Sequence, residues 1–463
     1  MHLALPPRAR ALRRAAALAL TVAVAQAALT VTSSPASAAA TDVPTPTVTG
    51  PVPVTATSYP FMSTEKDLER YGYIEEEFFL SGTATEYSTP TLATGSAVGE
   101  HPYATRVVVR RPASAKDFSG TVVLEWTNVT AGYDLEFEWF PSNEHFLRSG
   151  YAWVGVSAQR VGVDALRAWN PDRYGALDVT DGGTVTPSDA LSYDIYSQAA
   201  QAVRSGAGGI LGDLRPETVI AGGHSQSASR LALYHNSVHP LHQIVDGFII
   251  HGSSAALRKD LETKVIRVMA EGDVRTRTDS AEADTENFRR WEVAGTSHVG
   301  LNEREEYAPL VVRDRGATSP VDCERAPFSR VPFHYVLNAA YEHLVRWIEE
   351  GIAPPTAPRL EWVSETEKAR DADGNALGGI RLPQHAVPTA VNTGDNSGAG
   401  FCRLYGSHTP FDQEKLSDLY PNHGVYVSAV NAATNDAVRA GFLLTPDAQE
   451  TRRAASASAY GIQ

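Results

Sequence analysis

Residues 218–237 constrain the fold of this chain more than any other stretch. They read TVIAGGHSQSASRLALYHNS, in which a short β-branched and apolar run precedes small residues and then apolar residues at helical spacing. A strand that turns sharply into a helix brings two backbones close together, so the residues two positions before and after the turn residue must be small. Gly223 and Ser227 meet that requirement, although glycine is commoner at the position of Ser227. The stretch predicts a strand–turn–helix unit with Ser225 at the turn, as a catalytic nucleophile or as an ordinary polar turn residue.

Strand-like and helix-like segments alternate along most of the chain. Short runs of β-branched and aromatic residues are bounded by Gly, Pro or Asn, and several are apolar enough to be buried on both faces. We expect strands at residues 105–112, 120–128, 150–159, 243–252, 263–273 and 289–295, and helices at 143–149, 193–206 and 331–351. This alternation predicts an α/β fold with a mostly parallel central sheet and helices on both faces. In such sheets the catalytic residues gather at the carboxyl ends of the strands.

Residues 1–40 are typical of a secretory signal peptide. Four arginines between positions 8 and 14 precede an Ala- and Leu-rich run, and small residues follow at 36–40. The apolar run is shorter than the ~20 residues that a membrane-spanning helix needs, so we expect cleavage and secretion in place of a membrane anchor. The mature chain, 41–463, is predicted to form one domain. It comprises an extended lead-in at 41–60, a core at about 100–358 and a Gly- and Pro-rich appendage at 359–463 packed on that core.

The two cysteines, Cys323 and Cys402, are expected to form a disulfide bond. Export places the chain in an oxidising compartment, where a cysteine pair is stable as a disulfide. The alternative is two unrelated buried thiols. A bond between them closes a loop of about 80 residues and ties the appendage to the core.

A catalytic serine needs a base within hydrogen-bond reach and an acid that orients this base. In hydrolases whose nucleophile lies at a strand-to-helix turn, the chain order is serine, acid, histidine. The segment WEVAGTSHVG places His298 in a short loop after one predicted strand, and VIRVMAEGDVRT places Glu271 and Asp273 after the preceding one. Either carboxylate is able to orient His298, and the spacing from the strand favours Asp273. The sequence therefore predicts a triad of Ser225, His298 and either Asp273 or Glu271.

Two backbone N–H groups are expected to bind the substrate's carbonyl oxygen as it gains negative charge. One is the N–H of Gln226, the residue after the serine. The other is expected from the loop after the strand at 120–128, where Asn128, Val129 and Thr130 are the candidates. The loop continues as AGYDLEFEWFP, and four of its aromatic residues are predicted either to wall a substrate pocket or to pack in the core: Tyr133, Phe137, Trp139 and Phe140.

Together these segments resemble one family. The chain is similar to the little-characterised "alpha/beta hydrolase domain" family of mostly bacterial, often exported proteins. The resemblance covers nearly the whole mature chain and rests on GYIEEEFFLSGTATEY, VVLEWTNVTAGYD, GYAWVGVSAQRVGV, GGHSQSASRLALYHNSVHP, AEGD, VAGTSHVG, FHYVLNAAYEHLVRWIEEGIAPPTAPRL, GGIRLPQHAVPTA and GFCRLYG. It implies a one-domain hydrolase fold with a Ser–acid–His triad. It does not identify a substrate.

Composition and missing motifs exclude several classes of function. With 54 Asp and Glu against 40 Lys and Arg, the chain is acidic, which argues against nucleic acid as a partner. No His-Glu-x-x-His helix and no Gly-rich phosphate loop is present, so no metal and no other cofactor is implied. No segment of the mature chain is apolar enough for stable membrane insertion, and nothing in the sequence sets the oligomeric state.

The leading prediction is therefore a secreted serine esterase that cleaves a small-molecule or polymer ester through an acyl-enzyme on Ser225. Three alternatives stay open: an amidase or peptidase and an acyltransferase, both using the same triad, and a non-catalytic binding protein on a hydrolase scaffold.

Overall fold

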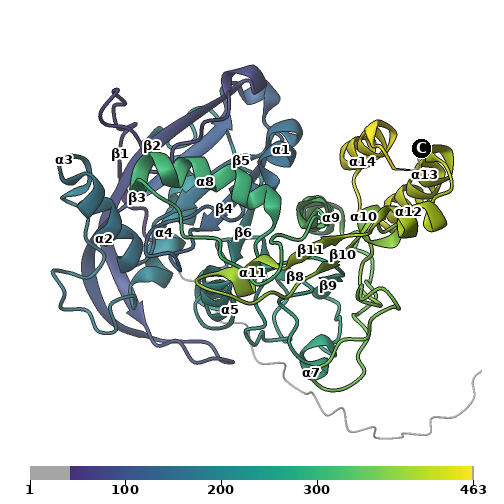
Figure 1. Cartoon of the computed structure of the whole chain (residues 1–463). Helices are drawn as coiled ribbons and strands as arrows, with labels where there is room; N and C mark the ends of the chain where they lie inside the picture. Colours follow the sequence, from purple (N-terminus) through teal and green to yellow (C-terminus); the bar gives the residue numbers. More distant parts are fainter. Residues whose placement is uncertain (1–41, 461–463) are drawn as a thin grey trace, which may run out of the picture. The chain divides into compact units, whose positions relative to one another are not determined.

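The computed structural model describes residues 42–460, and its main feature is a nine-stranded sheet (Figure 1). The order of the strands in the sheet is β1-β2-β3-β5-β4-β6-β7-β8-β9. Their bounds are β1 Thr47–Thr49, β2 Tyr73–Tyr87, β3 Ala97–Pro112, β4 Thr121–Trp126, β5 Ala152–Val156, β6 Thr218–His224, β7 Gly247–His251, β8 Lys264–Ala270 and β9 Phe288–Val293. The predicted signal peptide, 1–40, lies outside the described residues.

The sheet is parallel in one half and antiparallel in the other. β5, β4, β6, β7, β8 and β9 pair in parallel, whereas β1, β2, β3 and β5 pair antiparallel. Every residue of β4, β5, β6 and β7 is buried. A strand that is covered on both faces must be apolar at nearly every position, which explains why these four strands are predictable from the sequence. The predicted α/β fold is confirmed.

Helices cover both faces of the sheet. α5 (Gln226–Ser237) packs on β4, β6 and β7, and α9 (Phe333–Glu350) packs on β6, β7 and β8. Neighbouring residues of a strand point to opposite faces. A Cβ atom at Gly223 would lie 3.0 Å from Leu231 of α5, whereas one at Gly222 would lie 2.6 Å from the Tyr341 hydroxyl of α9. The two helices therefore lie on opposite faces, and both approach β6 so closely that a Cβ atom at either glycine would displace a side chain of the helix.

The other helices flank the sheet or follow it. Those before β9 are α1 Trp139–Ser149, α2 Arg160–Trp169, α3 Pro171–Tyr174, α4 Ser192–Ser205, α6 His239–His242 and α7 Arg277–Ser280, with 3₁₀ turns at Glu69–Tyr71, Ala115–Asp117 and Ala207–Gly209. Those after β9 are α8 Leu301–Arg315, α10 Pro383–Ala386, α11 Cys402–Tyr405, α12 Gln413–Leu419, α13 His423–Ala440 and α14 Thr445–Ala457. β10 (Ala390–Thr393) and β11 (Ser407–Pro410) form a separate two-stranded sheet.

The structure differs from the prediction at both ends of the core. The sheet begins before residue 100, because β2 pairs with β3 along its whole length and β1, within the predicted lead-in, pairs with β2. The region after residue 358 contains four helices of four to eighteen residues besides α11, and so holds more regular structure than an appendage of loops. Figure 1 shows α12, α13 and α14 gathered beyond β10 and β11.

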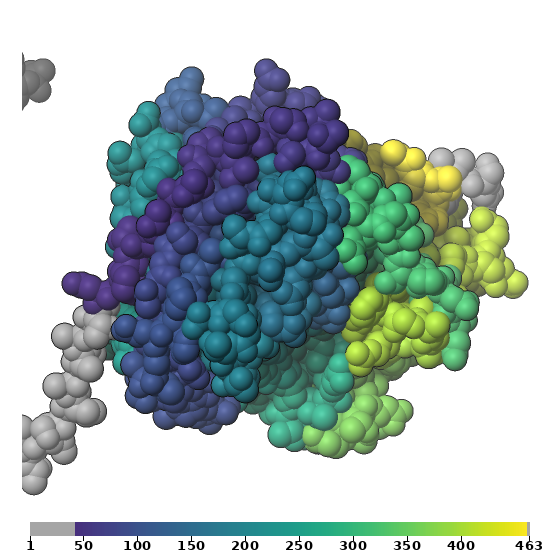
Figure 2. All heavy atoms as spheres, turned by 90° about the vertical axis from the view of Figure 1, so that its left-hand side faces the viewer, coloured from purple at the N-terminus to yellow at the C-terminus, as the bar shows by residue number. Residues whose placement is uncertain are grey.

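The C-terminal region is tied covalently to the segment after α8. Cys323 and Cys402 form a disulfide bond with an S–S distance of 1.97 Å. The segments around residues 300–330 and 395–410 lie side by side on the face shown in Figure 2, in green and yellow-green. Val299 also donates a backbone hydrogen bond of 2.9 Å to Leu404. The predicted disulfide is confirmed.

Candidate active site

Ser225 lies at a strained turn between β6 and α5. Its φ is 59° and its ψ is −114°, a conformation that non-glycine residues rarely adopt and that costs on the order of 1–3 kcal/mol. Its backbone N–H donates to the His251 carbonyl at 2.8 Å, and its carbonyl accepts from the Ser229 N–H at 3.0 Å. These bonds to a neighbouring strand and to the helix hold the turn in place. Strain of this kind is typical of a nucleophile presented at the carboxyl end of a sheet.

Ser227 closes the same turn and explains the departure from glycine at this position. Its side chain is fully buried. The Oγ atom accepts from the His224 N–H at 3.1 Å and donates to the His224 carbonyl at 2.9 Å. A glycine would satisfy the steric demand but supply neither bond, so serine adds local rigidity beside Ser225.

His298 and Asp273 form an acid–base pair in the loops after β9 and β8. Nδ1 of His298 is in hydrogen-bond contact with one carboxylate oxygen of Asp273. The other oxygen accepts from the Ala270 N–H at 2.8 Å. Burial alone raises the pKa of Asp273, but the charge of His298 and these hydrogen bonds outweigh it, so the pKa is lowered. Asp273 is therefore ionised at neutral pH and orients the imidazole.

Glu271, the other candidate acid, faces different partners. Oε2 accepts from the Gly295 N–H at 2.7 Å, and Oε1 accepts from the Arg370 guanidinium at 2.8 Å. Its side chain is completely buried. Glu271 thus joins the loop after β9 to the C-terminal region, and Asp273 is the carboxylate that contacts His298.

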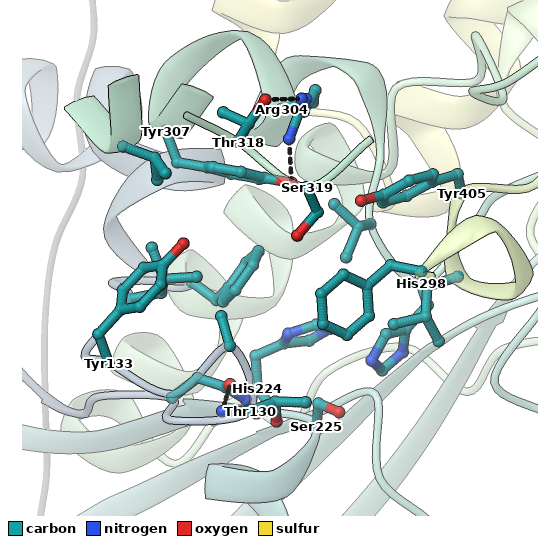
Figure 3. A pocket seen from close by; sticks show the side chains of 18 residues that line it. Thr130, Tyr133, His224, Ser225, His298, Arg304, Tyr307, Thr318, Ser319 and Tyr405 are labelled. Carbon is teal, nitrogen blue, oxygen red and sulfur yellow. Dashed lines mark hydrogen bonds between the residues drawn. The ribbon is translucent and has the colours of Figure 1, made fainter. Parts of the chain in front are cut away.

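Ser225 and His298 line one cavity, which has a volume of about 60 Å³. Figure 3 shows both side chains near the floor of this cavity, with His224 beside them and Arg304 and Thr318 at its opposite end. Within residues 42–460, no hydrogen bond joins the Ser225 hydroxyl to His298. Such bonds are often long in unliganded enzymes and shorten when substrate binds. The structure thus brings the serine and the histidine together without forming their hydrogen bond.

The loop after β4 supplies one N–H suited to an oxyanion. The Asn128 N–H donates to the Leu135 carbonyl at 2.9 Å, and the Thr130 N–H donates to the Asn128 side chain at 2.9 Å. This corrects the prediction for Asn128, whose N–H is already occupied; its side chain instead donates to the His224 carbonyl at 2.8 Å. In the described part of the chain, the N–H groups of Val129 and Gln226 have no acceptor.

A row of buried aromatic and acidic side chains packs against His298, and no sequence motif predicted it. The His224 ring lies 4.3 Å from the His298 ring and 4.1 Å from the His251 ring, measured between centroids. His251 Nδ1 lies 3.1 Å from Glu138, which accepts a 2.5 Å hydrogen bond from the Tyr341 hydroxyl. Burial, followed by the charges of the two neighbouring histidines, lowers the pKa of His224 well below its ordinary value. His224 is therefore neutral and packs against His298 without competing for protons.

Of the four loop aromatics, two line the cavity and two do not. Tyr133 and Phe137 are part of its wall. Trp139 packs against Trp153, and Phe140 packs against Phe137 and Tyr307 behind the wall. Each of the two predicted roles is therefore present in this loop.

No group of three or more His, Cys, Asp or Glu side chains in residues 42–460 is arranged to hold a metal ion. Among the helices of the same residues, none is both long and apolar enough to cross a membrane.

These features define a class of protein. A strained serine at the carboxyl end of a buried parallel strand, followed in the chain by an acid and a histidine after later strands, is the arrangement of α/β hydrolases. The chain belongs to the alpha/beta hydrolase domain family, whose model matches residues 48–453. The resemblance stated from the sequence is thereby confirmed.

The solved structures that match the chain are distant in sequence. XC6422 from Xanthomonas campestris, described as an a/b serine hydrolase without lid, is 15% identical over 51% of this chain and 98% of its own, with a TM-score of 0.29. The rice cell wall degrading esterase LipA from Xanthomonas oryzae is 10% identical over 43% of each chain, with a TM-score of 0.23. A fungal esterase from Rhizomucor miehei is 11% identical over 59% of this chain and 85% of its own, with a TM-score of 0.28. No curated protein matches the chain.

Proposed function

We propose that this protein is a serine hydrolase that cleaves carboxylic esters through an acyl-enzyme on Ser225. The observation that carries the proposal is the strained Ser225, which lines one cavity with a histidine that is held by a buried, ionised Asp273. A serine in an ordinary polar turn requires neither a positive φ nor an oriented imidazole beside it.

The reaction proceeds in two halves. Ser225 Oγ attacks the ester carbon while His298 Nε2 takes the hydroxyl proton, and the carbonyl oxygen becomes an oxyanion facing the N–H groups of Val129 and Gln226. The tetrahedral intermediate collapses, the bond to the alcohol oxygen breaks, and His298 donates its proton to that oxygen. Water then attacks the acyl-enzyme by the same steps, which releases the acid and restores Ser225.

We also propose that the protein works outside the cytoplasm. Two features support this localisation: the signal-like sequence of residues 1–40 and the Cys323–Cys402 disulfide bond, a bond type that persists in oxidising compartments.

Labelling with a fluorophosphonate probe, followed by intact-mass measurement and peptide mapping, tests the serine without any assumption about substrate. We expect one adduct, on Ser225, and none on Ser225→Ala. Ser205→Ala is the matched control, since Ser205 lies in the last turn of α4, away from the cavity, and its replacement leaves labelling unchanged. A folded protein without an adduct would overturn the proposal in favour of a binding protein.

A panel of paired esters and amides with the same acyl group then separates the reaction types. Esterase action predicts turnover of the esters well above that of the matched amides. Faster amide cleavage, or transfer to an added alcohol in preference to water, would assign the amidase or acyltransferase alternative instead.

A further inference from the structure

Two cavities of very different size meet at Ser225 and His298. The smaller has a volume of about 60 Å³, and the larger has a volume of about 1000 Å³. Both include Ser225 and His298 in their walls. An ester bound at Ser225 therefore extends one part into a small space and the other into a large one.

The small cavity is mostly apolar and aromatic. Its walls come from the loop after β4, from α8 and from the segment around α11, and they include Tyr133, Leu135, Phe137, Tyr307, Val311 and Leu404. At its far end the polar groups bond to one another, because Arg304 donates to the Thr318 hydroxyl at 2.8 Å and to the Tyr307 hydroxyl at 3.2 Å (Figure 3). The apolar and aromatic side chains that make up most of this lining suit an apolar group.

The size of the small cavity limits that group. Its volume is several times the roughly 10–15 Å³ that one buried water needs and far below that of the large cavity. A short acyl chain therefore fits it, and a long fatty acyl chain exceeds it.

Most of the residues that line the large cavity have polar or charged side chains, and their positive and negative charges balance. Its charged residues comprise three acids and three bases, namely Asp273, Asp279 and Asp395 with Arg275, Lys368 and Arg403. Hydroxyl and amide side chains also line it, including those of Gln226, Ser253, Ser254 and Asn396. Donors and acceptors without net charge suit a neutral ligand with many hydroxyl groups.

The order of the reaction decides which half of the ester occupies which cavity. The alcohol leaves first, while the acyl group stays bonded to Ser225 until water attacks. A large alcohol needs an open route of departure, which the large cavity provides, and the small cavity then shields the retained acyl group.

We propose that the substrate is an ester between a short, uncharged acyl group, bound in the small cavity, and a hydroxyl-rich alcohol such as a polyol or saccharide unit, bound in the large one. This proposal rests on the proposed esterase function.

The acyl half is tested with p-nitrophenyl esters of two to twelve acyl carbons, which share one leaving group. We expect kcat/KM to rise by about fourfold for each added CH₂ among the short acyl chains, because each buries apolar surface, and to fall at least tenfold by ten carbons. Val311→Ala enlarges the cavity and is expected to move the maximum to longer chains. Val312→Ala is the matched control: Val312 is next in α8 but 51% exposed, so the profile stays unchanged.

The alcohol half is tested with butyryl esters of a monosaccharide and of 1-hexanol. We expect the saccharide ester to have the higher kcat/KM. A flat acyl-length profile, a maximum at eight carbons or more, a preference for succinyl over butyryl esters, or a preference for the hexyl ester would overturn the assignment of the two cavities.

The two proposals fail in distinguishable ways. If Ser225 is labelled by the fluorophosphonate and short esters turn over, but the length profile is flat, the cavity assignment alone is wrong. If folded protein is not labelled at Ser225, the esterase proposal is wrong and the cavity assignment falls with it.

Discussion

Exchanging each candidate acid for its amide is expected to show which of the two orients His298. Asp273→Asn and Glu271→Gln are matched changes, since each keeps the side-chain shape and removes one buried negative charge. The structure gives them different partners: Asp273 contacts His298, and Glu271 binds Gly295 and Arg370.

Asp273→Asn removes the acceptor that fixes the imidazole tautomer and the charge that stabilises the imidazolium. A loss of this kind lowers kcat by about 10⁴-fold in a triad hydrolase, equivalent to about 5.4 kcal/mol of transition-state stabilisation. The Ser225 environment is otherwise unchanged, so the variant is expected to keep its melting temperature within about 2 °C of the parent.

Glu271→Gln keeps an acceptor for the Gly295 N–H but turns the charged bond to Arg370 into a neutral one. The Arg370 side chain is 29% exposed, so water partly compensates for the lost ion pair. We expect the substitution to lower the free energy of unfolding by about 2 kcal/mol. Over the described residues 42–460, the entropy of unfolding is about 0.9 kcal/mol per kelvin, so Tm falls by about 2 °C. Activity stays within about threefold of the parent.

The assay is kcat/KM on p-nitrophenyl butyrate together with Tm from differential scanning calorimetry, for both variants and the parent. Equal catalytic damage in the two variants, or damage in Glu271→Gln alone, would refute the assignment of Asp273 as the acid that orients His298.

Three further predictions concern stability and the floor of the site. The double variant Cys323→Ala/Cys402→Ala opens a loop with a sequence separation of 79, which in the chain-entropy model costs about 4.5 kcal/mol, and Tm should fall by about 5 °C; an unchanged Tm would contradict this. Gly252→Ala places a Cβ 3.1 Å from His224 and 3.2 Å from His298 at a φ of +66°, so kcat should fall at least tenfold; parent-like kcat would show that the imidazole has room to move. Acidification should destabilise the fold, because burial lowers the pKa of several histidines below the unfolded value of about 6.5, and the unfolded chain then binds more protons as pH falls. Each such histidine costs about 2 kcal/mol between pH 7 and pH 5, and calorimetry showing a flat Tm over this range would exclude the effect. The lowered pKa values are about 3 for His145 and about 4 for His235, His242 and His334.

The parts of the fold that sequence predicts best are those buried on both faces. β4, β6 and β7 are recognisable because a parallel strand between two layers of helices has to be apolar at nearly every position. β1 is different: it has three residues, lies at the sheet edge and joins the sheet through pairing with a strand more than thirty residues later. Its identity as a strand depends on that partner and not on its own sequence.

In the candidate site, too, some residues are predictable from the local sequence and others only from contacts between distant segments. Ser225 and His298 follow from short motifs, because the steric demands of the turn and the strand-end position are encoded within about ten residues of each. Asp273 and Glu271 differ in their partners, and one partner of Glu271, Arg370, lies 99 residues later in the chain, beyond the reach of a local motif. The row of His224, His251 and Glu138 joins three separate segments, so no single motif reveals it.

The positions of the reacting groups and of the cavity wall in the fold indicate which residues determine substrate preference. The reacting groups follow the carboxyl ends of β6, β8 and β9, where backbone pairing fixes their positions. Much of the cavity wall, in contrast, comes from α8 and the segment around α11, outside the sheet. Cys323 and Cys402 join the segments that carry these two walls. Substitutions there alter the space beside Ser225 without disturbing its strained turn or the Asp273–His298 pair. We therefore expect preference for acyl groups to change through residues 301–330 and 395–405, and the chemistry itself to change only through the strand ends.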